Sequence, residues 1–122
     1  MVPSYFPDYY AWPPSTIEVY RRPDIAVYLV FQARQSGAEA LWIVEALSIE
    51  GLPQGILHTP SIVAQAKTIP VKDRQGTLTV GLDASGNSLY RLQWSDGQRY
   101  YLVSTTHSLE DVIRISESMV RS

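Results

Sequence analysis

The sequence predicts an α+β domain in which one antiparallel sheet of six or seven strands carries a C-terminal helix across one face. Three observations predict it: two consecutive hairpin patterns between residues 76 and 103, two apolar β-rich runs earlier in the chain, and an amphipathic helical pattern at the end. Turn residues between alternating apolar strands are typical of hairpins. A helix with one apolar stripe has to bury that stripe, and a sheet face is the simplest place.

The chain opens with a segment dense in proline and aromatic side chains. Within residues 1–16 these are Pro3, Tyr5, Phe6, Pro7, Tyr9, Tyr10, Trp12, Pro13 and Pro14. Proline at this density bars a regular helix or a central strand, while so many aromatics argue against a free tail. We expect an extended arm packed onto the domain, followed by a short strand from Ile17 to Arg21.

Residues 25–31 and 41–44 are the most apolar runs and predict central strands joined by a turn at residues 35–37. Both faces are apolar: Leu29 and Phe31 share one face, and Tyr28 and Val30 share the other. An antiparallel sheet with one face in water alternates more cleanly than this. The second face therefore needs a cover other than the helix: an apolar ligand, the aromatic arm, or a symmetry-related copy.

Residues 51–60 predict a loop, after which two interpretations stay open. Thr59 and Pro60 suit the start of a short helix through Ala66, whereas Ile62 and Val63 favour a strand. Residues 69–72, which contain Pro70, suit an edge strand that ends in a turn at residues 73–76.

Two hairpins follow, and each makes a prediction about register. A three-residue loop at 84–86, with Gly86 left-handed, places Val80 opposite Tyr90 and Leu78 opposite Leu92. In the second hairpin, a two-residue type I′ turn at Asp96 and Gly97 places Leu92 opposite Tyr101. One face then carries Tyr90, Leu92, Trp94, Tyr101 and Val103, and the other carries Leu89, Arg91, Gln93, Tyr100 and Leu102.

The last element is predicted to be a helix over residues 108–121, capped by Ser108 with Asp111 at the third helical position. Its apolar stripe is expected to contain Leu109, Val112, Ile113, Ser116, Met119 and Val120. Glu110 with Arg114, and Glu117 with Arg121, form favourable i,i+4 pairs. The stripe is expected to lie on the sheet face that carries Trp94.

Length and charge exclude several classes of function. The 122 residues suit one domain: arm 1–16, sheet 17–106 and helix 108–121. The absence of cysteine excludes disulfides and thiol chemistry. A net charge of -2 disfavours nucleic acid as a partner. The sequence holds neither a membrane-spanning run nor a signal-peptide layout, so we expect no direct membrane insertion, although an excised domain stays possible.

With this order of elements, the chain resembles the uncharacterised bacterial domains found outside the membrane behind anti-sigma factors, in the lipoprotein-carrier-like (LolA-like) group. The match lies in residues 92–94, 97, 100–102 and 108–118, with a looser one in 3–7. The resemblance implies an extracytoplasmic sheet-plus-helix domain that binds a partner or an apolar ligand and has no catalytic residues to carry over. This chain departs from the group at Ser116, where alanine is usual, and it has no lipid-anchor cysteine or anti-sigma zinc motif.

Five side chains are candidates for contact with a ligand or partner: Tyr28, Trp42, Glu45, Arg91 and Tyr100. Glu45 is in line with Leu41 and Ile43, so it either finds a partner or marks a strand end that bends into solvent. Arg91, Arg99 and Tyr100 interleave charge and aromatics as single-strand nucleic-acid binders do, but the net negative charge argues against nucleic acid. Exposed Arg–Tyr packing across strands, which needs no ligand, is the favoured interpretation.

We predict no catalytic residue, no metal site and no cofactor. His107 and Ser108 beside Glu110 and Asp111 resemble hydrolase groups, but Ser108 already has a capping role. His58 and His107 lack metal-ligand spacing. The leading hypothesis is a non-enzymatic module that binds a protein or an apolar small molecule. The alternatives are a structural homodimer and an enzyme or enzyme inhibitor in which Glu45 and a histidine line a cleft.

Overall fold

The computed structural model describes residues 3–21 and 24–120. Within them, seven strands and two helices follow in the order β1 (Thr16–Tyr20), β2 (Ala26–Gln32), β3 (Glu39–Ala46), α1 (Gln54–Leu57), β4 (Ile62–Val71), β5 (Arg74–Leu82), β6 (Ser88–Ser95), β7 (Tyr100–Thr105) and α2 (Leu109–Met119). Neither helix of this part of the chain has the length and apolar character needed to cross a membrane.

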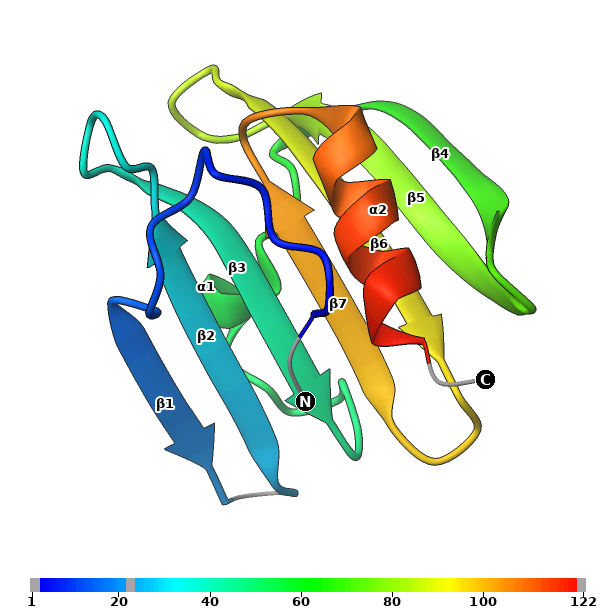
Figure 1. The fold of residues 1–122 in the computed structure, drawn as a ribbon. Coiled ribbons are helices and arrows are strands. Elements are labelled where there is room, and N and C mark those ends of the chain that lie inside the picture. Colours follow the sequence, from blue (N-terminus) through cyan, green and yellow to red (C-terminus); the bar gives the residue numbers. More distant parts are fainter. Residues whose placement is uncertain (1–2, 22–23, 121–122) are drawn as a thin grey trace.

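The predicted fold class is confirmed. The strands form one antiparallel sheet in the order β1-β2-β3-β7-β6-β5-β4, and α2 packs across it (Figure 1). The arm, dark blue in Figure 1, lies beside α2 on the same side of the sheet, while α1 lies behind the sheet. We call the side with α2 and the arm the helix face, and the other side the back face.

The arm is packed onto the domain, as expected. Tyr10 is fully buried and forms an isolated bridge with Ala33. Phe6 packs against Phe31 with 5.0 Å between ring centroids, and the Arg34 guanidinium donates to the Asp8 carbonyl at 2.9 Å. The aromatic side chains therefore bury the upper part of the helix face that α2 does not reach.

The central strands β2 and β3 are apolar on both faces, as predicted. Leu29, Phe31 and Ile43 belong to the core of the helix face. The side chains of the second core, on the back face, are Ala26, Tyr28, Val30, Trp42, Val44, Ala46, Leu52, Ile56, Leu57, Leu89 and Leu102. The cover of the back face is therefore the chain's own segment 47–60, which was not among the three covers expected.

Segment 51–60 contains the one-turn helix α1, which the sequence did not predict. Of the two interpretations for the next residues, the strand is confirmed, since β4 pairs with β5 along its length. Gly81 on β5 allows β4 to begin this close, because a Cβ there would lie 1.9 Å from the Ile62 carbonyl oxygen. The edge position of β4 is confirmed, but its turn lies at Lys72 and Asp73 and not at 73–76.

The first hairpin has the predicted register, with Leu78 opposite Leu92 and a left-handed Gly86. The predicted register of the second hairpin was wrong by two residues. Leu92 pairs with Val103, and Tyr101, its predicted partner, pairs with Trp94. The reason is the Asp96 carboxylate, which accepts the backbone N–H groups of Gln98 and Arg99 and thus stabilises a wider loop. Because a shift by two preserves the side-chain face, both predicted faces are correct.

Helix α2 begins as predicted, with the Asp111 N–H donating to the Ser108 side chain at 3.2 Å. The Glu110–Arg114 pair is present at 3.0 Å, while the Glu117–Arg121 pair lies outside the described residues. The predicted stripe was wrong at one end: Leu109 is 39% exposed, whereas Ile115 is fully buried. Compared with the predicted orientation, the helix is rotated about its own axis, so that Asp111, and not Leu109, faces the arm.

Candidate functional site

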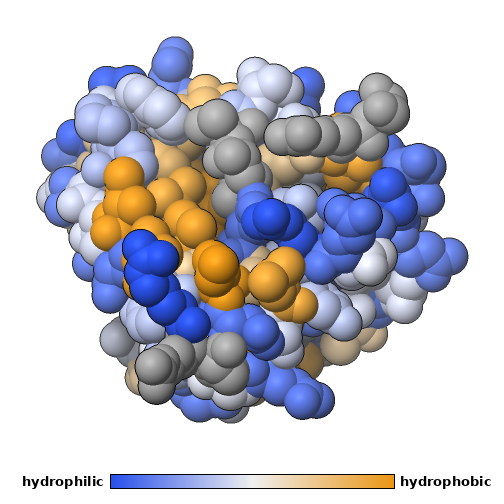
Figure 2. Space-filling view, turned by 90° about the horizontal axis from the view of Figure 1, so that it is seen from below, coloured by the Kyte–Doolittle hydropathy of each residue, from blue (hydrophilic) through white to orange (hydrophobic). Residues whose placement is uncertain are grey.

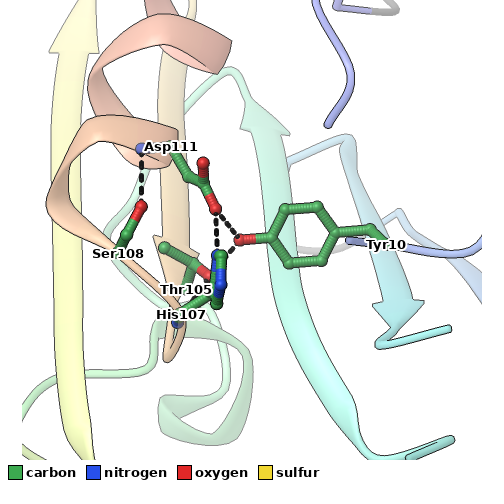
Figure 3. Close-up of polar contacts among 5 residues, drawn as sticks. All are labelled: Tyr10, Thr105, His107, Ser108 and Asp111. Atoms are coloured by element: carbon green, nitrogen blue, oxygen red, sulfur yellow. Dashed lines mark hydrogen bonds and ion pairs between the residues drawn. The ribbon is translucent and has the colours of Figure 1, made fainter. Parts of the chain in front are cut away.

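A polar cluster joins the arm to the start of α2 (Figure 3). The Tyr10 hydroxyl donates to the Asp111 carboxylate at 2.8 Å and also contacts the hydroxyl of Thr105, at the end of β7. The ring nitrogen Nδ1 of His107 lies 2.7 Å from the same carboxylate oxygen. Burial is the main cause that raises the pKa of Tyr10. We call Tyr10, Thr105, His107, Ser108 and Asp111 the arm lock.

The arm lock has an imidazole held by a carboxylate, which is part of a nucleophile-activating arrangement. The hydroxyl that bonds the carboxylate belongs to the fully buried Tyr10, and the Ser108 hydroxyl accepts a backbone N–H. The capping role predicted for Ser108 is thus confirmed. The His107 ring stacks on Tyr9 with 3.6 Å between centroids, so it also contacts the arm. These contacts fasten the arm to α2.

Three of the five predicted site residues come together beneath segment 47–60. The Tyr28 hydroxyl lies 2.7 Å from Nε2 of His58, and the Trp42 ring stacks on His58 with 4.2 Å between centroids. Arg91 donates to the Leu57 carbonyl at 2.9 Å. Tyr28 is 6% exposed and Trp42 is 8% exposed. Segment 47–60 therefore covers both side chains, and their role in contact with a ligand or partner stays a prediction.

Burial also changes the acid–base behaviour of this cluster. Desolvation lowers the pKa of His58 from its ordinary value of 6.5 to about 4. It likewise raises the pKa of Tyr28 and lowers that of Arg91. His58 is therefore neutral at pH 7, which suits a ring packed against two aromatic side chains.

The other two predicted site residues lie elsewhere. Glu45 forms an ion pair with Arg99 at 2.8 Å, so of its two interpretations the structure favours a carboxylate that has found a partner. Glu45 lies on β3 opposite Tyr101, on the helix face, whereas His58 is on the back face. The expected cleft between Glu45 and a histidine is not formed with His58. Tyr100 is 39% exposed at the start of β7.

One small pocket lies beside the end of α2. Its volume is about 40 Å³, and its lining residues are Arg74, Trp94, Asp96, Tyr101, Met119 and Val120. This volume holds water but not a drug-sized ligand. Among residues 3–21 and 24–120, no three histidine or acidic side chains are grouped closely enough to hold a metal ion.

Exposed apolar side chains gather on β1 and at the adjoining end of the sheet, where β2 begins and β3 ends. Ile17 is 63% exposed, Val19 and Ile25 are each 51% exposed, and Leu47 is 43% exposed. The N–H of Leu47 donates to the carbonyl of Ile25, which places these two side by side. Figure 2, which views the molecule from this end, shows apolar surface concentrated on the left, the side of β1. We call Ile17, Val19, Ile25 and Leu47 the β1 surface.

The two edges of the sheet differ in how they resist pairing with another strand. Edge strands are protected by lysine, proline and bulges. The strand β4 has Lys67, Pro70 and a register shift between Val63 and Gln65. The strand β1 has no lysine, proline or bulge within Thr16–Tyr20; it is five residues long, and its one charged side chain is that of Glu18. Its outer edge is thus open to another strand in the described part of the chain.

Neither the role of His58 nor the exposure of the β1 surface was predicted from the sequence. Isoleucine and valine on either side of Glu18 give the alternation of a half-buried strand, which predicts burial of both. No signal in the sequence shows that the arm turns away before it reaches Ile17. Comparisons of the chain with protein-family models, with curated proteins and with solved structures returned no match.

Proposed function

We propose that this chain is a non-enzymatic protein-binding module that takes a strand of its partner along β1. The observation that carries this proposal is an edge strand without lysine, proline or a bulge, on which two large apolar side chains, Ile17 and Val19, are more than half exposed. Addition of a strand to a sheet edge provides main-chain hydrogen bonds for affinity and side-chain contacts for specificity. An exposed apolar surface beside such an edge is typical of a protein-interaction site.

A protein fits this surface better than an apolar small molecule does. Segment 47–60 fills the back face, where the small molecule was expected, and the pocket beside α2 has room only for water. In contrast, β1 offers an extended row of backbone groups next to apolar side chains. The LolA-like resemblance supports the further proposal that the module works outside the membrane, as part of an exported or anchored bacterial protein.

Substitution of Val19 by lysine is expected to weaken partner binding at least tenfold. Lysine on an edge strand opposes pairing, and a tenfold loss corresponds to about 1.4 kcal/mol. The probe is a set of extended peptides selected from a displayed library on the wild-type chain, with affinities measured by calorimetry. Because Val19 is half exposed, the substitution is expected to change the free energy of unfolding by no more than about 0.5 kcal/mol.

The matched control is Thr68→Lys, which adds the same charge to the exposed edge strand β4. Its peptide affinities are expected to equal those of the wild type. Selected peptides that bind the Val19→Lys chain as tightly as the wild type would exclude β1 as the docking strand. Peptides that lose affinity only with Thr68→Lys would move the site to the other edge.

A further inference from the structure

We infer that the partner strand of β1 is β1 of a second copy of this chain, paired antiparallel about a twofold axis that passes through Val19. This inference rests on the proposed function, because it names the occupant of the same edge. The other edge, β4, is protected by Lys67, Pro70 and its register shift. A symmetric pair of β1 strands is therefore the self-association that the sheet leaves open.

Symmetry restricts the registers in which two β1 strands can pair. A twofold axis perpendicular to the sheet keeps the helix face of one copy beside the helix face of the other. Residues that lie opposite each other then share a face, so an odd-numbered residue meets an odd-numbered one. In β1 the helix face carries Ile17 and Val19, which pair with Leu29 and Val27 of β2, and the back face carries Glu18 and Tyr20.

Charge and polarity distinguish the three registers whose axis passes through Ile17, Glu18 or Val19 in the middle of β1. An axis through Glu18 places two carboxylates directly opposite each other, which is destabilising. An axis through Ile17 places Val19 opposite Ser15, so that it meets a polar residue. An axis through Val19 joins the two valines on the helix face and places Glu18 opposite Tyr20 on the back face.

The contacts of the Val19 register are complementary in the chain as it stands. The Tyr20 hydroxyl already donates to the Glu18 carboxylate at 3.1 Å within one chain, so these groups suit each other across the axis as well. Ile17 lies opposite the exposed Arg21, whose aliphatic stem can cover it while the guanidinium stays in water. On the helix face the two Val19 side chains then meet at the axis, and each is flanked by Ile17 of one copy and Arg21 of the other.

Single cysteines test this register directly, because the chain has no cysteine of its own. Opposite residues of an antiparallel pair have Cα atoms roughly 4.5–5.5 Å apart, within the range of a disulfide. In the Val19 register, position 18 of one copy lies opposite position 20 of the other. The two Cα atoms at position 18 are therefore about 8 Å apart, which is too far for a disulfide. The variants are Val19→Cys, Glu18→Cys and, as a collision control of similar exposure on β4, Ile62→Cys.

Mild oxidation is expected to cross-link most of the Val19→Cys chain, and several-fold less of the Glu18→Cys and Ile62→Cys chains. Sedimentation equilibrium of the wild type is expected to show a dimer that Val19→Lys converts to a monomer. A wild type that stays monomeric, or cross-linking equal at all three positions, would overturn the second copy as partner. In that event the loss of peptide affinity in Val19→Lys still decides the proposed function, since that measurement needs no dimer.

Discussion

Replacement of Asp111 by alanine is expected to lower the free energy of unfolding by about 3 kcal/mol, the largest effect we predict for a single substitution. The Asp111 carboxylate accepts from the Tyr10 hydroxyl and contacts Nδ1 of His107 within the arm lock. Hydrogen bonds to a charged group contribute about 1.5–3 kcal/mol, and the fully buried Tyr10 loses one of its two partners. Urea denaturation followed by tryptophan fluorescence measures the change.

The matched control is Glu110→Ala, one residue earlier on α2. Glu110 forms an exposed pair with Arg114, so its loss is expected to cost about 0.3–0.5 kcal/mol. Tyr10→Phe combined with Asp111→Ala completes a double-mutant cycle, which isolates the coupling between the arm and α2. A cycle with no coupling energy would show that the arm is held by its aromatic packing alone.

Acidification is expected to destabilise the chain through His58, by about 2 kcal/mol between pH 7 and pH 4. Burial lowers the pKa of His58 to about 4, so the folded state favours the neutral ring. A group with a lowered folded pKa stabilises the fold fully above its unfolded value near 6.5, and this contribution is lost as the pH falls toward 4. A pKa lowered from 6.5 to about 4 corresponds to about 3 kcal/mol, and we expect about 2 kcal/mol because solvent reaches part of the ring.

The variant that isolates this effect is His58→Asn. His58 has a left-handed backbone with φ of 47°, which asparagine tolerates, and an amide does not titrate. The difference in unfolding free energy between wild type and variant is expected to shrink by about 2 kcal/mol from pH 7 to pH 4. If this difference stays constant with pH, segment 47–60 does not hold His58 in the neutral state.

Patterns between residues near in sequence predicted most of the sheet and the helix. Ser108 and Asp111 are three residues apart, and Gly86 determines its hairpin within a few residues, so local chemistry decides both. The second hairpin shows the limit of this approach, because a carboxylate that accepts two N–H groups shifted the register without changing the faces. The alternation of apolar and polar residues along a strand predicts which sheet face a residue lies on more reliably than it predicts the opposite residue on the neighbouring strand.

The covers of the two faces could not be predicted, because they depend on contacts between distant residues. Arg91 reaches the Leu57 carbonyl from a strand 34 positions later, and Tyr10 meets Asp111 across 101 positions. The need to cover the back face could be predicted because β2 and β3 are apolar on both faces, but the identity of the cover could not. In the same way, the exposure of Ile17 and Val19 depends on where the arm ends its path across the sheet.

Amide hydrogen exchange of the wild-type chain, diluted until sedimentation shows it to be monomeric, is compared with and without an excess of a selected strand peptide to determine whether β1 is the docking strand. We predict that the peptide slows exchange in Thr16–Tyr20 at least about tenfold, because each new main-chain hydrogen bond protects its N–H group. Exchange in Ile62–Val71 and in segment 47–60 is predicted to stay unchanged. Protection that appears in either of those segments and not in β1 would exclude β1 as the docking strand.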